Sequence, residues 1–194
     1  MPALAVRLAL FGLLALAAAP VRAAQVRSLS VHESAGVYTV DMRARLNAPP
    51  RAIYAALTDY RALPRINPAI RSVRVLPSVH GARSVRVATV LRACVWFYCK
   101  VLHQVQRMTA KPPHELKAVV LPARSDFRSG RARWTVEPCK HESCLAFHAT
   151  LEPDFWVPPL IGPWLIQKKL RSEAEVTARG LERLARARAT AGQP

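Results

Sequence analysis

One stretch decides the fold: EPDFWVPPLIGPW at residues 152–164, where a series of strand-like segments ends and one long amphipathic segment begins. From Trp164 to Ala187, leucine and valine recur at helical spacing with charged residues between them, which predicts a helix with one apolar stripe. Pro163 suits the first position of this helix, because proline lacks the N–H that would be unpaired there. One apolar stripe needs one partner surface, and we expect that surface to be a sheet.

The residues before this stretch alternate between apolar and polar side chains, as half-buried strands do. Val40 and Met42 fall on one face of such a strand, and Asp41 and Arg43 fall on the other. We expect strands at residues 25–33, 37–46, 70–79, 82–93, 99–108, 115–121, 130–136 and 144–151, a short helix at 51–59 and a broken helical turn at 61–69. This order predicts an α+β fold with its helices on one face of an antiparallel sheet.

The amino terminus has the features of a secretory signal peptide. Residues 1–7 are a short basic start, residues 8–19 are apolar, and Val21-Arg22-Ala23 offers small residues for cleavage after Ala23. The alternative is a retained membrane anchor, but the uncharged stretch of residues 8–21 is shorter than the roughly 20 residues that cross a bilayer. We therefore expect a leader at 1–23, one domain at 24–187, a flexible tail at 188–194, and a mature protein in the periplasm.

The cysteines agree with export, because an oxidising compartment allows disulfide bonds. They fall in two identical spacings, Cys94-x4-Cys99 and Cys139-x4-Cys144. Four cysteines allow three pairings, and we expect the local one, in which each pair joins the two arms of a hairpin. Zinc is the weaker alternative, because zinc motifs favour shorter spacings and the histidines form no matching cluster.

The charge of the chain predicts an acidic partner. Removal of Arg7 and Arg22 with the leader leaves 27 basic residues against 12 acidic ones, a net charge of +15. For an exported protein we expect an anionic membrane surface as partner rather than nucleic acid, although much of this charge also fits the solvated faces of strands. Trp96, Phe97 and Tyr98, between the first two cysteines, either pack under another element or contact a membrane interface.

Residues 57–68, LTDYRALPRINP, resemble the helix-and-loop signature of START-like proteins in the polyketide-cyclase and coenzyme-Q-binding branch of the SRPBCC superfamily. Residues 125–130, SDFRSG, before a strand with Trp134, and residues 152–165 resemble exported bacterial members of that branch. The resemblance covers residues 37–184. It implies a helix-grip fold, in which a curved sheet wraps the C-terminal helix and leaves an elongated apolar cavity. Relatives include lipid carriers, a ribosome-association-toxin-like group and aromatase/cyclases.

Few residues of the chain are candidates for proton transfer. They are His103, His148, Asp126 and Asp154. His103 shares its strand parity with Val101 and Val105 and can therefore face inward, whereas His148 lies opposite the apolar face of its strand. A histidine without a positioned partner seldom acts as a catalyst, so we favour a structural His103, and we expect the two aspartates to cap turns or to pair with arginines such as Arg128. The sequence has no nucleophile elbow, phosphate loop or metal cluster, and we expect no cofactor and no metal.

Binding is the function that the sequence favours. We expect the following residues near a cavity for a lipid, isoprenoid or quinone-like ligand, although each also suits an ordinary core: Tyr54, Leu57, Ile66, Phe127, Trp134, Phe147, Phe155, Trp156, Trp164 and Leu165. The leading hypothesis is a monomeric periplasmic carrier. The alternatives are a cyclase or dehydratase that uses His103 or Asp126 as a base, and an envelope interaction protein with a filled core.

Overall fold

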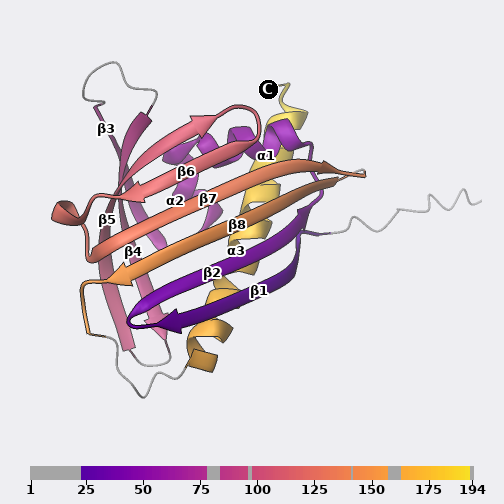
Figure 1. Ribbon diagram of the computed structural model, residues 1–194. Coiled ribbons are helices and arrows are strands. Elements are labelled where there is room, and N and C mark those ends of the chain that lie inside the picture. Colours follow the sequence, from indigo (N-terminus) through magenta and orange to yellow (C-terminus); the bar gives the residue numbers. More distant parts are fainter. Residues whose placement is uncertain (1–22, 78–83, 96–97, 141, 157–162, 193–194) are drawn as a thin grey trace, which may run out of the picture.

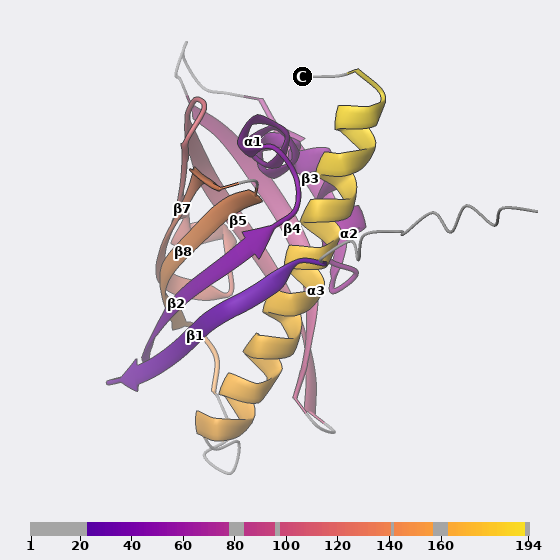
Figure 2. The same cartoon turned by 90° about the vertical axis from the view of Figure 1, so that its right-hand side faces the viewer.

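The computed structural model describes residues 23–77, 84–95, 98–140, 142–156 and 163–192. Within these ranges, eight strands form one antiparallel sheet in the order β1-β2-β8-β7-β6-β5-β4-β3. They are β1 (Gln25–Ser34), β2 (Val37–Leu46), β3 (Ile70–Leu76), β4 (Ser84–Val95), β5 (Tyr98–Lys111), β6 (Glu115–Val120), β7 (Phe127–Cys139) and β8 (Glu142–Pro153). The sheet curves around a long helix (Figures 1 and 2), which confirms the predicted α+β helix-grip fold.

The helices lie together on one side of this sheet (Figure 2). They are α1 (Pro50–Thr58), a 3-10 turn η1 (Tyr60–Ala62), α2 (Leu63–Ile66) and α3 (Pro163–Thr190), while a second 3-10 turn, η2 (Pro122–Arg124), connects β6 to β7. The long helix begins at Pro163, as predicted. It continues past the tail predicted from residue 188, because Arg188 forms an ion pair with Asp59 and donates a 3.1 Å hydrogen bond from Nη1 to the carbonyl oxygen of Ala55. The last helical turn therefore belongs to the folded domain.

Both disulfides have the predicted local pairing. Cys94 and Cys99 lie directly opposite each other on β4 and β5, with 4.0 Å between their Cα atoms. Cys139 and Cys144 join β7 to β8, with 5.4 Å between their Cα atoms. The two bonds staple hairpins at different ends of the sheet.

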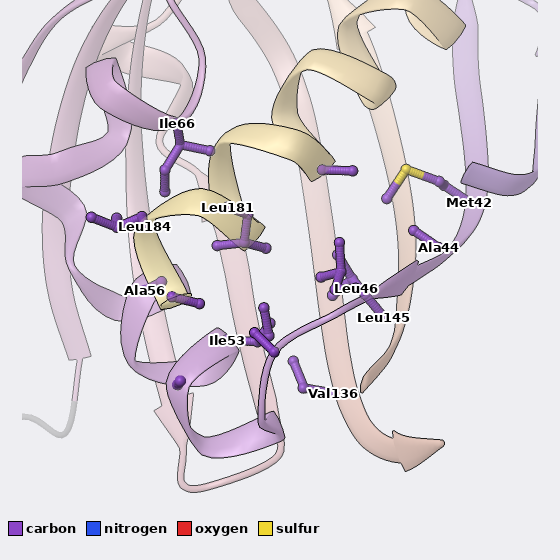
Figure 3. Close-up of a cluster of buried hydrophobic side chains, with 14 of the residues drawn as sticks. Met42, Ala44, Leu46, Ile53, Ala56, Ile66, Val136, Leu145, Leu181 and Leu184 are labelled. Atoms are coloured by element: carbon purple, nitrogen blue, oxygen red, sulfur yellow. The ribbon is translucent and has the colours of Figure 1, made fainter. Parts of the chain in front are cut away.

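The core fills one end of the space between sheet and helices. Leu46 of β2, Ile53 of α1 and Leu181 of α3 are among its largest fully buried side chains. Figure 3 shows these residues together with Leu145 and Leu184 between the helices and the strands. Full burial of an aliphatic side chain of this size contributes about 1.5–3 kcal/mol. This cluster therefore fixes the C-terminal half of α3 to the sheet.

The two halves of α3 differ in burial. Among its described side chains, those that are buried begin at Ala178, whereas Ile166 and Leu170 are only partly buried. The C-terminal half is packed against α1, α2 and the core, and the N-terminal half covers a less filled part of the sheet. This difference positions the site described below.

Asn67, in the segment that resembles START-like proteins, ties α2 to α3. Its Nδ2 atom donates to Oε2 of Glu173 at 3.0 Å and to Oγ1 of Thr177 at 2.9 Å. Its Oδ1 atom accepts a 2.8 Å hydrogen bond from the backbone N–H of Ala69. One side chain thus holds the loop before β3 against the middle of α3.

Gly180 allows α3 to approach α2 closely. A Cβ atom added at this position would overlap the carbonyl oxygen of Ile66, which is backbone and cannot swing aside. We expect Gly180→Ala to lower the free energy of unfolding by about 1–3 kcal/mol, the usual cost of overpacking, despite the ~1 kcal/mol that alanine gains in helix propensity. Urea denaturation measures this change. Ser172→Ala, at an exposed position of the same helix, is the control and should change stability by no more than about 0.5 kcal/mol. An alanine at 180 as stable as wild type would contradict the close contact.

Glu173 should make stability depend on acid pH. Burial alone would raise the pKa of Glu173, but hydrogen bonds from Lys169 and Asn67 outweigh it and hold that pKa below its ordinary value of 4.5. A carboxylate with a lowered folded-state pKa stabilises the fold above the unfolded-state value and loses this contribution as pH falls through the folded-state value. Wild type should therefore lose stability below about pH 4.5 more steeply than Glu173→Gln in urea denaturation at each pH. Equal slopes for the two proteins would contradict the stabilising role of the Glu173 carboxylate.

Candidate ligand-binding site

A cavity of about 360 Å³ lies between the sheet and the N-terminal half of α3. Its wall comes from β2, β4, β5, β8, the segment after β8 and α3, and almost all of the wall is apolar. The wall residues are Tyr38, Val40, Ala93, Tyr98, Lys100, Leu102, Phe147, Ala149, Leu151, Pro153, Phe155, Ile166 and Leu170. Its volume lies within the range of about 300–1,000 Å³ that is usual for small-molecule sites.

Strand alternation positions the wall. Val40 of β2 pairs with Ala149 of β8, and Tyr38 pairs with Leu151, so these side chains share the inner face of the sheet. Ala149 is small, and it faces the half of α3 that the core does not hold down. Small side chains beneath a partly buried helix leave the space that the cavity occupies.

Two of the predicted ligand-binding aromatics line the cavity, and two others pack against them. Phe147 and Phe155 belong to the wall. Trp134 packs against Phe147 with 5.1 Å between ring centroids. Phe127 meets the ring of Phe155 edge to face at 6.1 Å. Such pairs fix ring orientation, which keeps the wall preformed.

The other predicted ligand-binding residues lie elsewhere. Tyr54, Leu57 and Ile66 pack in the filled end of the molecule. Trp156 is 71% exposed. Leu165 is partly buried outside the wall, and the side chain of Trp164 lies outside the described part of the chain.

The phase of α3 explains why Leu165 is not in the wall. Leu170 lies eleven residues, about three helical turns, before the buried Leu181, and Ile166 lies about one turn before Leu170; both line the cavity. Leu165 is one position, or about 100°, out of this phase. The apolar stripe predicted from the sequence includes Leu170, which lines the cavity, and Leu165, which does not.

The predicted membrane-contacting aromatics are divided between the cavity and the undescribed part of the chain. Tyr98 lines the cavity from the first position of β5. Trp96 and Phe97 lie outside the described residues, and their contact with a membrane stays a prediction.

His103 lies on the outer face of the sheet, so the expectation that it can face inward was wrong. Leu102 and Gln104, its neighbours on β5, are the buried inward residues, while the side chain of His103 is 64% exposed. Its backbone N–H donates a 2.7 Å hydrogen bond to Oδ2 of Asp126, and its Nδ1 atom is 3.5 Å from that oxygen. Asp126 thus accepts a hydrogen bond from the edge of β5, rather than capping a turn or pairing with an arginine.

The Ser125-Asp126-Phe127 segment continues the sheet where β6 ends. Ser125 Oγ accepts a 2.9 Å hydrogen bond from the backbone N–H of Val105, and the N–H of Asp126 donates to the carbonyl oxygen of His103 at 2.9 Å. The N–H of Asp154 then donates to the carbonyl oxygen of Asp126 at 3.0 Å. These bonds place Phe127 beneath Phe155, so this segment supports the cavity wall.

The two remaining proton-transfer candidates are also paired on the outside. His148 Nδ1 lies 2.8 Å from Oδ1 of Asp41, on the outward face that strand parity predicted. Arg128 Nε donates a 2.8 Å hydrogen bond to Oδ1 of Asp154, the arginine pairing that we expected. Neither residue lines the cavity.

The titratable groups of the described wall are Tyr38, Tyr98 and Lys100. Burial raises the pKa of Tyr38 above its ordinary value of 10.0, and the nearby Glu33 carboxylate raises it further. The described wall contains no carboxylate and no imidazole, the groups that usually transfer protons near neutral pH.

A family model described as polyketide cyclase/dehydrase and lipid transport matches residues 46–178. The chain belongs to this family. The description names two activities, and the START-like resemblance of residues 57–68 agrees with the match. No curated protein matches the chain in sequence.

Several solved structures share the fold. A protein from Thermus thermophilus has a TM-score of 0.62 at 18% identity, over 77% of this chain and 97% of that one. The Zhui aromatase/cyclase from a Streptomyces species has a TM-score of 0.60 at 14% identity, over 81% and 99%. A STAR-related lipid transfer protein from Xanthomonas axonopodis has a TM-score of 0.58 at 12% identity, over 79% and 98%. At these identities the likeness establishes the fold.

Within the described ranges, no helix is long and apolar enough to cross a membrane. The same part of the chain contains no group of three or more histidine, cysteine, aspartate or glutamate side chains placed to hold a metal ion.

The two disulfides should differ in their effect on the cavity. Ala93 and Lys100, which flank the Cys94–Cys99 pair, line the wall, whereas the Cys139–Cys144 pair lies at the far end of β8. Both double Cys→Ser variants should lose less than the ~3 kcal/mol expected for a 15-residue loop, because both loops are short. Only the Cys94→Ser/Cys99→Ser variant should also bind a fluorescent fatty acid more weakly, measured by fluorescence titration. If the two variants bind the fatty acid with equal affinity, the Cys94–Cys99 hairpin does not contribute to the site.

Proposed function

We propose that this protein is a periplasmic carrier that binds a lipid, isoprenoid or quinone-like ligand in the cavity beneath the N-terminal half of α3. The single observation that supports this proposal best is the apolar wall, which contains no carboxylate or imidazole among its described residues. An apolar chain transferred from water into such a cavity gains about 0.8 kcal/mol for each buried methylene group. The family description, which includes lipid transport, supports the same function.

Cyclisation or dehydration is the second candidate, because the family description and the Streptomyces aromatase/cyclase both name such chemistry. It has less support from the site. His103 and Asp126, the candidate bases, contact each other on the outer face of the sheet. A base on that face cannot reach a molecule held in the cavity.

Export and membrane contact complete the proposal. The signal-peptide pattern of residues 1–23 and the two disulfides fit an oxidising compartment. A net charge of +15 after removal of the leader would bring the carrier to an anionic membrane, with about 1 kcal/mol for each basic residue near the surface. There, Trp96 and Phe97 would meet the bilayer interface.

A bulkier side chain at Ala149 should block the cavity. Ala149→Phe places a ring among the wall residues, so affinity for a fluorescent fatty acid and for an uncharged fluorescent quinone analogue should fall by about tenfold or more, the loss expected when 1.4 kcal/mol of apolar burial is displaced. Ala146→Phe is the matched control, because Ala146 lies on the same strand but alternation places it on the opposite face. Thermal unfolding of both variants separates loss of binding from loss of fold.

Native mass spectrometry of the protein purified from its own periplasm should find a co-purified hydrophobic molecule in wild type and not in Ala149→Phe. If wild type carries no such molecule and binds neither probe, the carrier function is wrong. A turnover activity that His103→Ala removes without loss of fold would favour the enzyme instead.

A further inference from the structure

One cation stands at the otherwise apolar cavity. Lys100, on the inner face of β5 between Tyr98 and Leu102, is the only residue of the described wall that carries a charge at neutral pH. Because the wall is apolar almost throughout, Lys100 contributes its methylene groups to it. Its Nζ atom lies 4.8 Å from the centroid of the Phe155 ring, in a cation–π contact. The methylene groups of Lys100 thus lie along the apolar wall and its ammonium group lies beside a ring. Lys100 therefore marks the boundary between the cavity and water.

The ammonium group of Lys100 has no carboxylate partner among the described residues. Asp126 and Asp154, which directly precede Phe127 and Phe155, already have other partners. Asp154 forms an ion pair with Arg128, and Asp126 accepts a hydrogen bond from a backbone N–H on the outer face. Lys100 therefore keeps its hydrogen-bond donors available next to the cavity. An anionic group placed there could bind the ammonium group of Lys100 without displacing a carboxylate of the described residues.

We propose that the ligand is a single-chain amphiphile with an anionic head group, whose chain fills the cavity and whose head lies beside the ammonium group of Lys100. This inference rests on the proposed carrier function and specifies its ligand class. A charge-assisted hydrogen bond from an ammonium group to a carboxylate or phosphate is roughly twice as strong as one between neutral groups. An uncharged chain of the same length would fill the cavity equally well but would dehydrate Lys100 without compensation.

The basic residues on the outer face of the sheet cannot make this distinction. Arg107 and Arg131, for example, are exposed on the outer face, which alternation separates from the cavity by the thickness of the sheet. Their attraction for an anion is long-range and is screened over about 8 Å at physiological salt. Because Lys100 is the only lysine or arginine of the described wall, we expect the preference for an anionic head over a neutral one to depend on it.

The test is isothermal titration calorimetry of the mature protein with four twelve-carbon compounds: dodecanoate, dodecyl phosphate, the uncharged methyl dodecanoate and dodecyltrimethylammonium. Wild type should bind the two anions about tenfold more tightly than the ester and should bind the cation weakest, because one charge-assisted bond distinguishes them. A preference for only one of the anions would identify the head group as carboxylate or phosphate.

Substitutions at Lys100 test whether this residue causes the preference for an anionic head group. Lys100→Gln should weaken binding of the anions by about tenfold and leave the ester within about twofold, and Lys100→Arg should restore the preference because the charge is kept. Lys168→Gln is the matched control, because Lys168 is exposed on α3 and the substitution removes the same unit of charge. It should leave all four affinities within about twofold at physiological salt.

The outcomes separate the two proposals. If wild type binds the ester as tightly as the anions, or if Lys100→Gln weakens ester and anions equally, the head-group inference is overturned while the carrier function stands. If none of the four compounds binds, the head-group inference is overturned, and the carrier function falls with it only when native mass spectrometry also finds no co-purified hydrophobic molecule. Thermal unfolding of Lys100→Gln and Lys100→Arg shows that the variants compared are folded.

Discussion

The close contact between Gly180 of α3 and the backbone of Ile66 fixes the position of the long helix, on which the rest of the structure depends. It brings the middle of α3 against α2, where Asn67 adds hydrogen bonds to Glu173 and Thr177. Two residues after Gly180, the buried carboxylate of Glu182 accepts a 2.7 Å hydrogen bond from the backbone N–H of Asn47. The C-terminal half of α3 is therefore held by shape, by hydrogen bonds and by apolar burial together.

The cavity follows from this one-sided attachment. A helix of 28 residues is longer than the filled core, so its N-terminal half extends over the sheet, where Ile166 and Leu170 are its described side chains that line the space below. Ala93 and Ala149 keep that space open, and the rings of Phe147 and Phe155, each supported by a second aromatic, keep its shape. The cavity is thus a consequence of where the helix is anchored and of which wall residues are small.

The sequence could predict the strands and helices but only part of the site. Strand alternation is local, so it identified the inner face of β8 and the outward position of His148 correctly. The wall also depends on the docking of α3 and on the curvature of the sheet, which no short segment encodes. The choice between Leu165 and Ile166 required the phase of the helix, and the orientation of His103 required the register of β5 against β4. Ala93 and Ala149 carry no sequence signal of their own, because alanine is common in any core and marks a cavity only once the surrounding elements are placed.

The positive charges on the two faces of the sheet act over different distances. Basic residues on the outer face act at long range, where salt screening and solvent leave little selectivity and where they raise the encounter rate with any anionic surface or molecule. Lys100 acts at contact distance, with its methylene stem in an apolar wall and its ammonium group on an aromatic ring. The same type of charge therefore attracts broadly on one face and discriminates on the other, because burial and distance, rather than net charge, determine whether an electrostatic interaction can select a ligand.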